Sequence, residues 1–290
     1  MDEKQLLKIL RAYKKGEVGE GAVLAFLKQA PFTELSGIKI DHHRKLRTGF
    51  PEVIFGQGKS VSQLQEICTH LVLANRPLII TRLEPEIGVF LADLFPEKIF
   101  YLDMARIALG QAEYATYKKF STEVEEDSES VSDDDNSSTG RILLIAAGSS
   151  DIPVAEEAAT ILAVAGKRFR RIYDVGVAGL HRLIDVLPEL QRADILLVFA
   201  GMEGALPSVI AGLVSSPVIG VPTSIGYGTG LNGITPLFAM LNSCAPGVSV
   251  VNIDNGFGAA MMAIAIDSLK EKEGYGNGPA GQWENQEWLD

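Results

Sequence analysis

Arg141-Ile-Leu-Leu-Ile-Ala-Ala-Gly-Ser-Ser-Asp151 is the stretch that decides the fold. An apolar run of strand length leads into glycine and hydroxyl residues, and an apolar pattern with helical spacing follows them. This order of strand, polar turn and helix recurs through the rest of residues 141–270. We therefore predict a doubly wound parallel sheet with helices on both faces, a three-layer αβα domain. The predicted strands are Arg141–Ala147, Arg171–Val175, Ile195–Phe199, Val218–Val221 and Ser249–Ile253, and the predicted helices are Val154–Ala165, Leu180–Leu190, Pro207–Val214, Pro236–Leu241 and Ala259–Lys270.

Residues 1–120 have a different pattern, which predicts a smaller mixed α/β domain in front of the parallel sheet. Amphipathic spacing predicts helices over Asp2–Tyr13, Gly21–Gln29 and Val61–Asn75. Ser60 stands where it can cap the third of these helices. Short apolar runs predict strands at Val53–Phe55, Leu78–Thr81 and Lys98–Tyr101.

An acidic segment separates the two halves. Eight acidic residues and no basic residue lie between Ser121 and Gly140, and the rest of the chain contributes only −3 to the net charge of −11. The segment is also rich in serine and poor in apolar residues, so we expect residues 121–140 to be a disordered, solvated linker. An acidic segment that competes for a basic partner is the alternative. The polar, glycine-rich tail over residues 271–290 is expected to be disordered as well.

The composition limits the classes of protein that the chain can represent. Two cysteines give no disulfide framework, which favours a reducing compartment. The first residues, Met-Asp-Glu-Lys-Gln, lack the apolar core of a signal peptide, and no apolar run reaches the length of a membrane span. Basic and aromatic residues are not clustered as in nucleic-acid-binding proteins. We expect a cytoplasmic protein that binds neither membranes nor nucleic acid.

Glycine and polar residues follow every predicted strand of the parallel sheet. Since ligands of such folds bind at the carboxyl ends of the strands, these five turns together predict a small-molecule site, although any one of them alone is more often an ordinary turn. Ser149, Ser150 and Asp151 precede a helix and suit a phosphate or another anion, with helix capping as the alternative role. The five turns are Gly148–Asp151, Gly176–His181, Ala200–Pro207, Pro222–Gly228 and Asp254–Gly258.

The two cysteines lie in contrasting surroundings. Cys68 falls within a helix-like apolar pattern and is expected to belong to the core. Cys244 follows Asn242 and Ser243 in a turn-prone stretch between a predicted helix and a predicted strand, where a thiol can be presented to a ligand. A buried loop cysteine is the alternative, because cysteine usually behaves as a small apolar residue.

Four long motifs allow a comparison with known families. They are Gly148-Ser-Ser-Asp-Ile-Pro-Val-Ala-Glu-Glu-Ala158, Phe199-Ala-Gly-Met-Glu-Gly-Ala-Leu-Pro-Ser208, Leu241-Asn-Ser-Cys-Ala-Pro-Gly-Val-Ser-Val-Val-Asn-Ile-Asp-Asn-Gly-Phe-Gly258 and Asp41-His-His-Arg-Lys-Leu-Arg-Thr-Gly-Phe-Pro-Glu-Val-Ile-Phe-Gly-Gln-Gly-Lys59. Together they closely resemble the LarB family, the carboxylase/hydrolase of nickel-pincer cofactor biosynthesis. The C-terminal half is also distantly similar to PurE, the aminoimidazole ribonucleotide mutase/carboxylase, so we expect a PurE-like sheet. The acidic linker and the tail lie outside the resemblance.

The resemblance to LarB implies a reaction. It is the carboxylation of nicotinic acid adenine dinucleotide at C5 of its pyridinium ring, followed by cleavage of the phosphoanhydride to pyridinium-3,5-biscarboxylic acid mononucleotide and AMP. Cys244 is implied as the nucleophile that makes C5 reactive by adding to C4. The implied co-substrate is CO2 or bicarbonate, the implied cofactor is Mg²⁺ or Mn²⁺, and the dinucleotide has no redox role.

The resemblance also suggests roles for residues around the strand ends. Glu203 is a candidate acceptor of the C5 proton or a metal-linked carboxylate, and a solvated loop acid is equally consistent with the sequence. Asp151 is a candidate Mg²⁺ ligand at the substrate phosphates. His181 is a candidate for ribose binding or phosphoanhydride cleavage, with a structural role as the alternative. The remaining candidates for substrate binding are Ser149, Ser150, Gly201, Met202, Asn242, Ser243, Asp254 and Asn255.

Basic residues in the N-terminal motif form a further candidate group. Arg44, Arg47 and Lys59 suit a diphosphate or carboxylates. The run from Gly56 to Ser60 looks like part of a P-loop, but a true one requires glycine at the position of Val53, so we reject a nucleoside triphosphatase.

Two other functions remain open. A PurE-like purine enzyme is disfavoured because the PurE segment Ala-His-Leu-Pro-Gly, whose histidine shuttles protons, has Ala205 at that position here. A non-catalytic nucleotide-binding regulator, of the type labelled circadian phase modifier, should tolerate the loss of Cys244. By analogy with PurE octamers we also expect a symmetric homo-oligomer.

Overall fold

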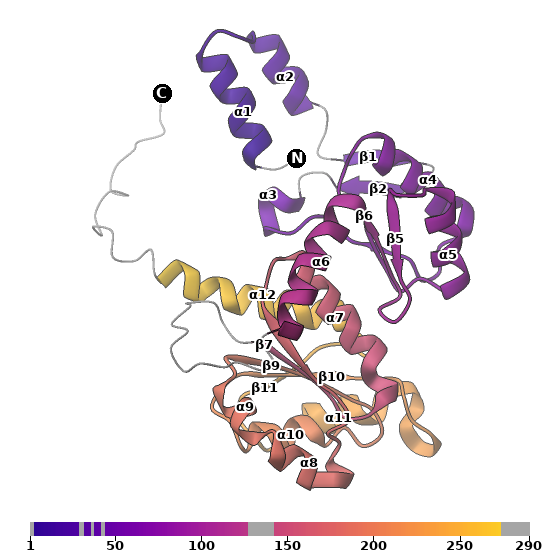
Figure 1. The fold of residues 1–290 in the computed structure, drawn as a ribbon, viewed down its shortest axis with the longest axis vertical. Helices are drawn as coiled ribbons and strands as arrows, with labels where there is room; N and C mark the ends of the chain where they lie inside the picture. The colour runs from indigo at the N-terminus through magenta and orange to yellow at the C-terminus, as the bar shows by residue number, and fades with distance from the viewer. Residues whose placement is uncertain (1–2, 29–31, 36–37, 42–43, 127–141, 274–290) are drawn as a thin grey trace. The chain divides into compact units, whose positions relative to one another are not determined.

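The computed structural model describes residues 3–28, 32–35, 38–41, 44–126 and 142–273 (Figure 1). The chain divides into two compact units, Met1–Tyr117 and Lys118–Asp290. None of the described helices is both long enough and apolar enough to cross a membrane.

The C-terminal unit is built on five parallel strands in the order β11-β10-β9-β7-β8. All residues of the three central strands are buried, which is typical of a parallel sheet covered on both faces. The predicted fold class, an α/β protein with a doubly wound parallel sheet, is confirmed. The strands are β7 (Ile142–Ala146), β8 (Phe169–Ile172), β9 (Ile195–Ala200), β10 (Val218–Pro222) and β11 (Val248–Val250).

Helices cover both faces of this sheet. α7 (Ile152–Val164) and α12 (Gly256–Glu273) pack against each other and lie on one face, and the other helices lie on the opposite face (Figure 1). Alternate strand residues such as Leu143 and Val198 form the core on that second face. Its helices are α8 (Leu180–Asp185), α9 (Leu187–Arg192), α10 (Leu206–Ala211) and α11 (Ile234–Leu241), and three short 3-10 helices, η1 (Ser149–Asp151), η2 (Val177–Gly179) and η3 (Gly228–Gly233), lie in the loops.

Several predictions in this unit were inaccurate. β11 ends at Val250 rather than Ile253, and α10 ends at Ala211 rather than Val214. β8 begins at Phe169 rather than Arg171, because its pairing with β7 starts at Phe169 and Ile142. The helix predicted over residues 180–190 is two helices, since the chain leaves helical geometry at Val186, and Pro188 occupies the first turn of α9.

The N-terminal unit contains a mixed four-stranded sheet in the order β3-β4-β6-β5, as the sequence predicted in outline. Ser60 caps α4 in a reciprocal arrangement with Gln63, which confirms the predicted cap. The sequence did not predict β1, β2, α3, α5, β6 or α6. The elements are α1 (Glu3–Lys14), α2 (Glu20–Lys28), a β1–β2 hairpin (Phe32–Leu35, Ile38–Asp41), α3 (Arg44–Thr48), β3 (Ile54–Phe55), α4 (Val61–Leu73), β4 (Ile79–Thr81), α5 (Pro85–Leu94), β5 (Ile99–Leu102) and β6 (Ile107–Gly110). α6 (Gln111–Glu126) begins in this unit and continues past its last residue, Tyr117.

Two helices extend into segments that were expected to be disordered. α6 continues to Glu126, six residues into the predicted linker, because this part of the acidic segment contains helix-forming glutamates. α12 continues to Glu273, three residues into the predicted tail. The remainder of both segments, residues 127–140 and 274–290, lies outside the described residues.

Candidate functional site at the strand ends

The carboxyl ends of β7 and β9 mark the point where the strand order reverses. β7 has β8 on one side and β9 on the other, so the connections that leave these two ends run in opposite directions. Ligands of open α/β sheets bind in the crevice at such a point. The turns after β7 and β9 contain Ser149, Ser150, Asp151, Gly201, Met202 and Glu203, which the structure therefore places at one edge of the sheet.

Asp151 ties these turns together. Its side chain is only 4% exposed, and its Oδ1 accepts a hydrogen bond of 2.6 Å from the hydroxyl of Thr223, which follows β10. Its Oδ2 accepts one of 3.0 Å from the Gly148 amide. Burial raises the pKa of the Asp151 carboxyl, whereas hydrogen bonds from Thr223, Gly148 and Gly201 favour the charged form, and the charge of Asp254 adds to the increase.

Ser149, Ser150 and Glu203 are exposed at this edge, where a ligand can reach them. Gly201 is buried, and a Cβ atom at this position would lie 2.2 Å from the Ile225 carbonyl oxygen, so the close approach of the two turns requires glycine. Met202 has a φ of 54° and a side chain that is 39% exposed. The turn after β9 thus presents Met202 and Glu203 to solvent.

Asp254 and Asn255 lie at the same edge, after β11, and both form turn contacts. Asp254 adopts a φ of 54°, and its Oδ1 accepts a hydrogen bond of 2.7 Å from the Ser224 amide. The side chain of Asn255 accepts one of 2.8 Å from the Gly258 amide in the first turn of α12. The turn role that the sequence left open for these two residues is therefore present in the structure.

Cys244 lies at the other end of the sheet. It follows α11, which runs from the carboxyl ends of the strands toward their amino ends, as the connection between two parallel strands must. The loop ends at Gly247, whose carbonyl accepts a hydrogen bond from Val218, the first residue of β10. Pro236, in the first turn of α11, contacts Gly204 in the turn after β9. α11 ends at Leu241, about 7.5 Å along the helix from Pro236, and Cys244 follows three residues later.

Within the part of the chain that the structure describes, no hydrogen bond or ion pair joins Cys244 to Glu203 or Asp151, and the loop that carries the thiol lies by the amino ends of β10 and β11. The thiol of Cys244 is exposed. Its neighbour Ser243 lies 2.5 Å from Ser208 on α10, measured between the two hydroxyl oxygens. The Asn242 side chain donates a 2.8 Å hydrogen bond to the Phe238 carbonyl, so it closes the end of α11.

His181 is exposed on α8, which begins near the carboxyl end of β8. Its neighbour Arg182 forms a 2.7 Å ion pair with Asp174. His181 thus lies at the edge where the sequence placed it, beside the β8 turn rather than between β7 and β9.

The basic candidates belong to the N-terminal unit. Arg44 and Arg47 lie on α3, and the exposed Arg47 forms an ion pair with Asp41, whose hydrogen bond and charge raise the pKa of Arg47. Lys59 donates a 2.8 Å hydrogen bond to the Phe55 carbonyl. Two of these three cations therefore have protein partners of their own.

The described residues do not form a metal-binding cluster. No group of three or more His, Cys, Asp and Glu side chains among them is arranged to hold a metal ion. Asp151 is buried, and both of its oxygens accept protein hydrogen bonds, so its geometry does not fit direct coordination. Mg²⁺ often needs few protein ligands because substrate phosphates supply the others.

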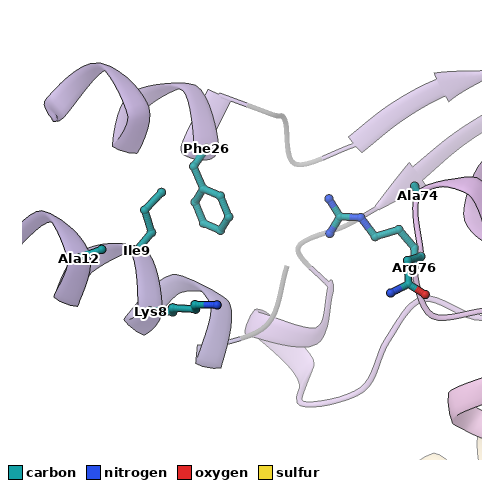
Figure 2. A pocket seen from close by; sticks show the side chains of 7 residues that line it. Lys8, Ile9, Ala12, Phe26, Ala74 and Arg76 are labelled. Carbon is teal, nitrogen blue, oxygen red and sulfur yellow. The ribbon is translucent and has the colours of Figure 1, made fainter. Parts of the chain in front are cut away.

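A separate hollow of about 500 Å³ lies in the N-terminal unit (Figure 2). Lys8 and Arg76 contribute charge to a lining that is otherwise formed mainly by small or apolar residues of α1, α2 and the end of α4. Figure 2 shows the Arg76 side chain extending across the opening toward Phe26. None of the candidate residues predicted from the sequence lines this hollow.

Thr223 is the contact residue at the strand ends that sequence reasoning missed. It belongs to the turn Pro222–Gly228, but nothing in the sequence distinguishes its hydroxyl from the others in that turn. The only available signal was its position directly after a buried strand.

Comparisons with known families agree with the two-unit organisation. Residues 32–112 match the family described as LarB/PurE-like N-terminal domain, and residues 141–276 match the family described as AIR carboxylase. The two matches fall on either side of the acidic segment.

Individual relatives divide into those similar to the whole chain and those similar to its C-terminal half. An uncharacterized protein of Methanocaldococcus jannaschii is 38% identical over 275 residues, 93% of this chain and 99% of its own length. The N5-carboxyaminoimidazole ribonucleotide mutase of the same organism is 35% identical over 136 residues, 45% of this chain and 81% of its own. The corresponding mutase of Pyrococcus abyssi is 36% identical over 141 residues, 46% of this chain and 76% of its own.

Proposed function

Since the chain belongs to the LarB family, with a LarB/PurE-like N-terminal domain and an AIR carboxylase domain, we propose that it carboxylates the pyridinium ring of nicotinic acid adenine dinucleotide. The ring gains a carboxylate at C5. Hydrolysis of the phosphoanhydride by water then gives pyridinium-3,5-biscarboxylic acid mononucleotide and AMP. The dinucleotide serves as a carbon acceptor and is neither oxidised nor reduced.

The exposed thiol of Cys244 is the observation that carries this proposal. The other cysteine, Cys68, is fully buried, and burial raises its pKa to about 12, so its thiolate is scarce at neutral pH. Cys244 is open to solvent in a loop between α11 and β11. Of the two thiols, that of Cys244 is therefore our proposed nucleophile.

A thiolate solves the chemical problem that this reaction poses. A pyridinium carbon is electron-poor and does not attack CO2. Addition of the Cys244 thiolate to C4 forms a C–S bond and moves an electron pair into the ring, which makes C5 nucleophilic. C5 then bonds to CO2, a base takes the C5 proton, and expulsion of the thiolate restores the aromatic ring. Thiols suit both the addition and the departure.

The exposed Glu203 is our proposed acceptor of the C5 proton. It lies in the turn after β9, beside the point where the strand order reverses. Ser149 and Ser150, exposed before α7, are proposed to bind the anionic part of the substrate through their hydroxyls and the adjacent amide groups. A divalent cation bound to the substrate diphosphate would withdraw charge from the phosphoanhydride.

The separation of Cys244 from Glu203 supports a second part of the proposal, namely that two copies of the chain form each site. One copy contributes the thiol from the amino edge of its sheet, and another contributes the strand-end turns. Apolar side chains near the thiol favour such an assembly, because Phe238 is 57% exposed and Leu241 is 60% exposed on α11. Tyr227, close to η3, is 81% exposed. We therefore propose a homo-oligomer.

The experiment that tests the reaction supplies nicotinic acid adenine dinucleotide, Mg²⁺ and isotopically labelled bicarbonate, and detects products by mass spectrometry. The expected products are AMP and a labelled biscarboxylated mononucleotide. Cys244→Ala should abolish labelling. Cys68→Ala is the matched control, since it removes the buried thiol and should leave the reaction intact.

Two results would contradict the proposed reaction. Full activity of Cys244→Ala would exclude the thiol adduct. Absence of product from the unmodified protein would exclude this substrate and favour the alternative function, a non-catalytic nucleotide-binding regulator. The PurE-like alternative is tested in the same way with N5-carboxyaminoimidazole ribonucleotide, and we expect no conversion because Ala205 cannot transfer a proton.

A further inference from the structure

Three turns at the strand ends converge on a single carboxylate. The hydroxyl of Thr223 donates to Asp151 Oδ1 at 2.6 Å, and the amide of Gly148 donates to Oδ2 at 3.0 Å. A backbone hydrogen bond from Gly201 reaches the same carboxylate. These donors come from the loops after β10, β7 and β9, so Asp151 fixes three separate segments relative to one another.

The hydroxyl of Thr223 is the only side-chain donor among these three groups. Thr223 is fully buried, and a buried hydroxyl is unfavourable unless it has a hydrogen-bond partner. A valine of similar shape would fill the space without that requirement. Gly201 packs directly on the hydroxyl, since a Cβ atom on Gly201 would lie 2.7 Å from Thr223 Oγ1. The Thr223 hydroxyl thus contacts two other turns: it donates a hydrogen bond to Asp151 in the turn after β7, and it lies against Gly201 in the turn after β9.

Ser149 and Ser150, which are exposed next to the Asp151 carboxylate, are the groups that we propose to face a ligand. Ser149 and Ser150 lie between Gly148 and Asp151 in the sequence, so the position of the carboxylate sets the conformation of the turn that carries them. Asp151 itself is buried, and both of its oxygens already accept hydrogen bonds from the protein, so it is not placed to touch a ligand. Its effect on a ligand is therefore indirect.

We propose that Thr223 is a positioning residue whose hydroxyl, acting through the Asp151 carboxylate, holds the Ser149–Ser150 turn in the conformation that binds the phosphate groups of the dinucleotide. This inference rests on the proposed function for its substrate. It assigns Asp151 to the support of the site in place of metal coordination.

The test compares three variants of the full-length protein in the carboxylation assay. Thr223→Val removes the hydroxyl and keeps the shape of the side chain, and Thr223→Ser restores a hydroxyl. Thr160→Val is the matched control, because Thr160 is also fully buried, and its hydroxyl has no hydrogen-bond partner within the part of the chain that the structure describes. Circular dichroism and thermal melting establish that each variant is folded.

We expect Thr223→Val to raise KM for the dinucleotide about tenfold or more, the range typical of leaving a buried hydrogen-bonding group without its partner. The change in kcat should be smaller than the change in KM. Thr223→Ser should recover most of the loss, and Thr160→Val should behave as the unmodified protein. If Thr223→Val matches Thr160→Val in KM, the inference is wrong while the proposed function stands.

Direct binding separates this inference from the proposed reaction. AMP is titrated into the unmodified protein and into Thr223→Val by calorimetry. If the unmodified protein makes no product but binds AMP about tenfold or more tightly than Thr223→Val does, the reaction is wrong and the positioning role holds. Equal affinities, or no binding of AMP to either protein, would overturn the positioning role.

Discussion

Lys167 Nζ lies 2.7 Å from Asp267 Oδ2, and the two side chains are only 17% and 7% exposed. Lys167 follows α7 and Asp267 belongs to α12, so the ion pair joins the two helices that cover one face of the parallel sheet. Charges removed from water are tolerated only when they are paired. This pair therefore makes the packing of α12 on α7 sensitive to the loss of either partner.

Asp267→Ala is expected to lower the free energy of unfolding by about 3 kcal/mol, because it leaves a largely buried ammonium group behind. Urea unfolding followed by circular dichroism measures the change. The matched control is Glu189→Ala, which breaks the more exposed 2.9 Å pair of Glu189 with Arg170 and should lower that free energy by less than about 1 kcal/mol.

A double variant tests the cause of this effect. Lys167→Met combined with Asp267→Leu replaces both charges with apolar groups, so it should be more stable than Asp267→Ala alone. Equal losses in the single and double variants would show that the packing of the replaced side chains, rather than the loss of the carboxylate beside Lys167, determines stability.

The parallel sheet was predictable because its signals are local and repeated. β7, β9 and β10 are continuous apolar runs, and each is followed by glycine and polar residues. β6 and α5 were not predicted from the sequence. The pairing of β6 with both β4 and β5 depends on contacts that a single short segment does not reveal.

The sequence predicted which turns form the site, but it did not predict which side chains of those turns contact one another. The spacing of strands and turns placed Ser149, Asp151 and Glu203 at one edge of the sheet. The predicted parallel order of β10 and β11 already implied that α11 carries Cys244 toward the amino ends of the strands, but not which residues of the other loops the thiol would contact. The Thr223–Asp151 contact joins residues 72 positions apart, and no local pattern encodes it.

Gly201→Ala is expected to abolish carboxylation and to destabilise the C-terminal unit. Its Cβ would lie 2.2 Å from the Ile225 carbonyl oxygen, so the two backbone turns would have to separate by about 1 Å or more to restore an ordinary contact. Gly230→Ala is the control, because a Cβ there meets no atom within 4 Å. Assay and thermal melting should both distinguish the two variants, and wild-type activity in Gly201→Ala would show that the turn is free to move.

Cys68 should make the stability of the protein depend on pH in alkaline solution. Burial raises its pKa from an ordinary 9.0 to about 12 in the folded state. The unfolded chain therefore releases the thiol proton first, and stability should fall as the pH rises above about 9. Urea unfolding at several alkaline pH values measures this slope. Cys68→Ala should have a shallower slope than the unmodified protein, and parallel slopes would contradict a buried neutral thiol.

Complementation between inactive variants tests whether two copies share one site. Cys244→Ala lacks the nucleophile and Glu203→Gln lacks the proposed base, so each should be inactive alone. When the two are co-expressed with different affinity tags, a shared site can combine the thiol of a Glu203→Gln copy with the carboxylate of a Cys244→Ala copy. Random mixing in equal amounts gives about one quarter of wild-type activity. If both groups came from one chain, co-purified mixtures would stay inactive.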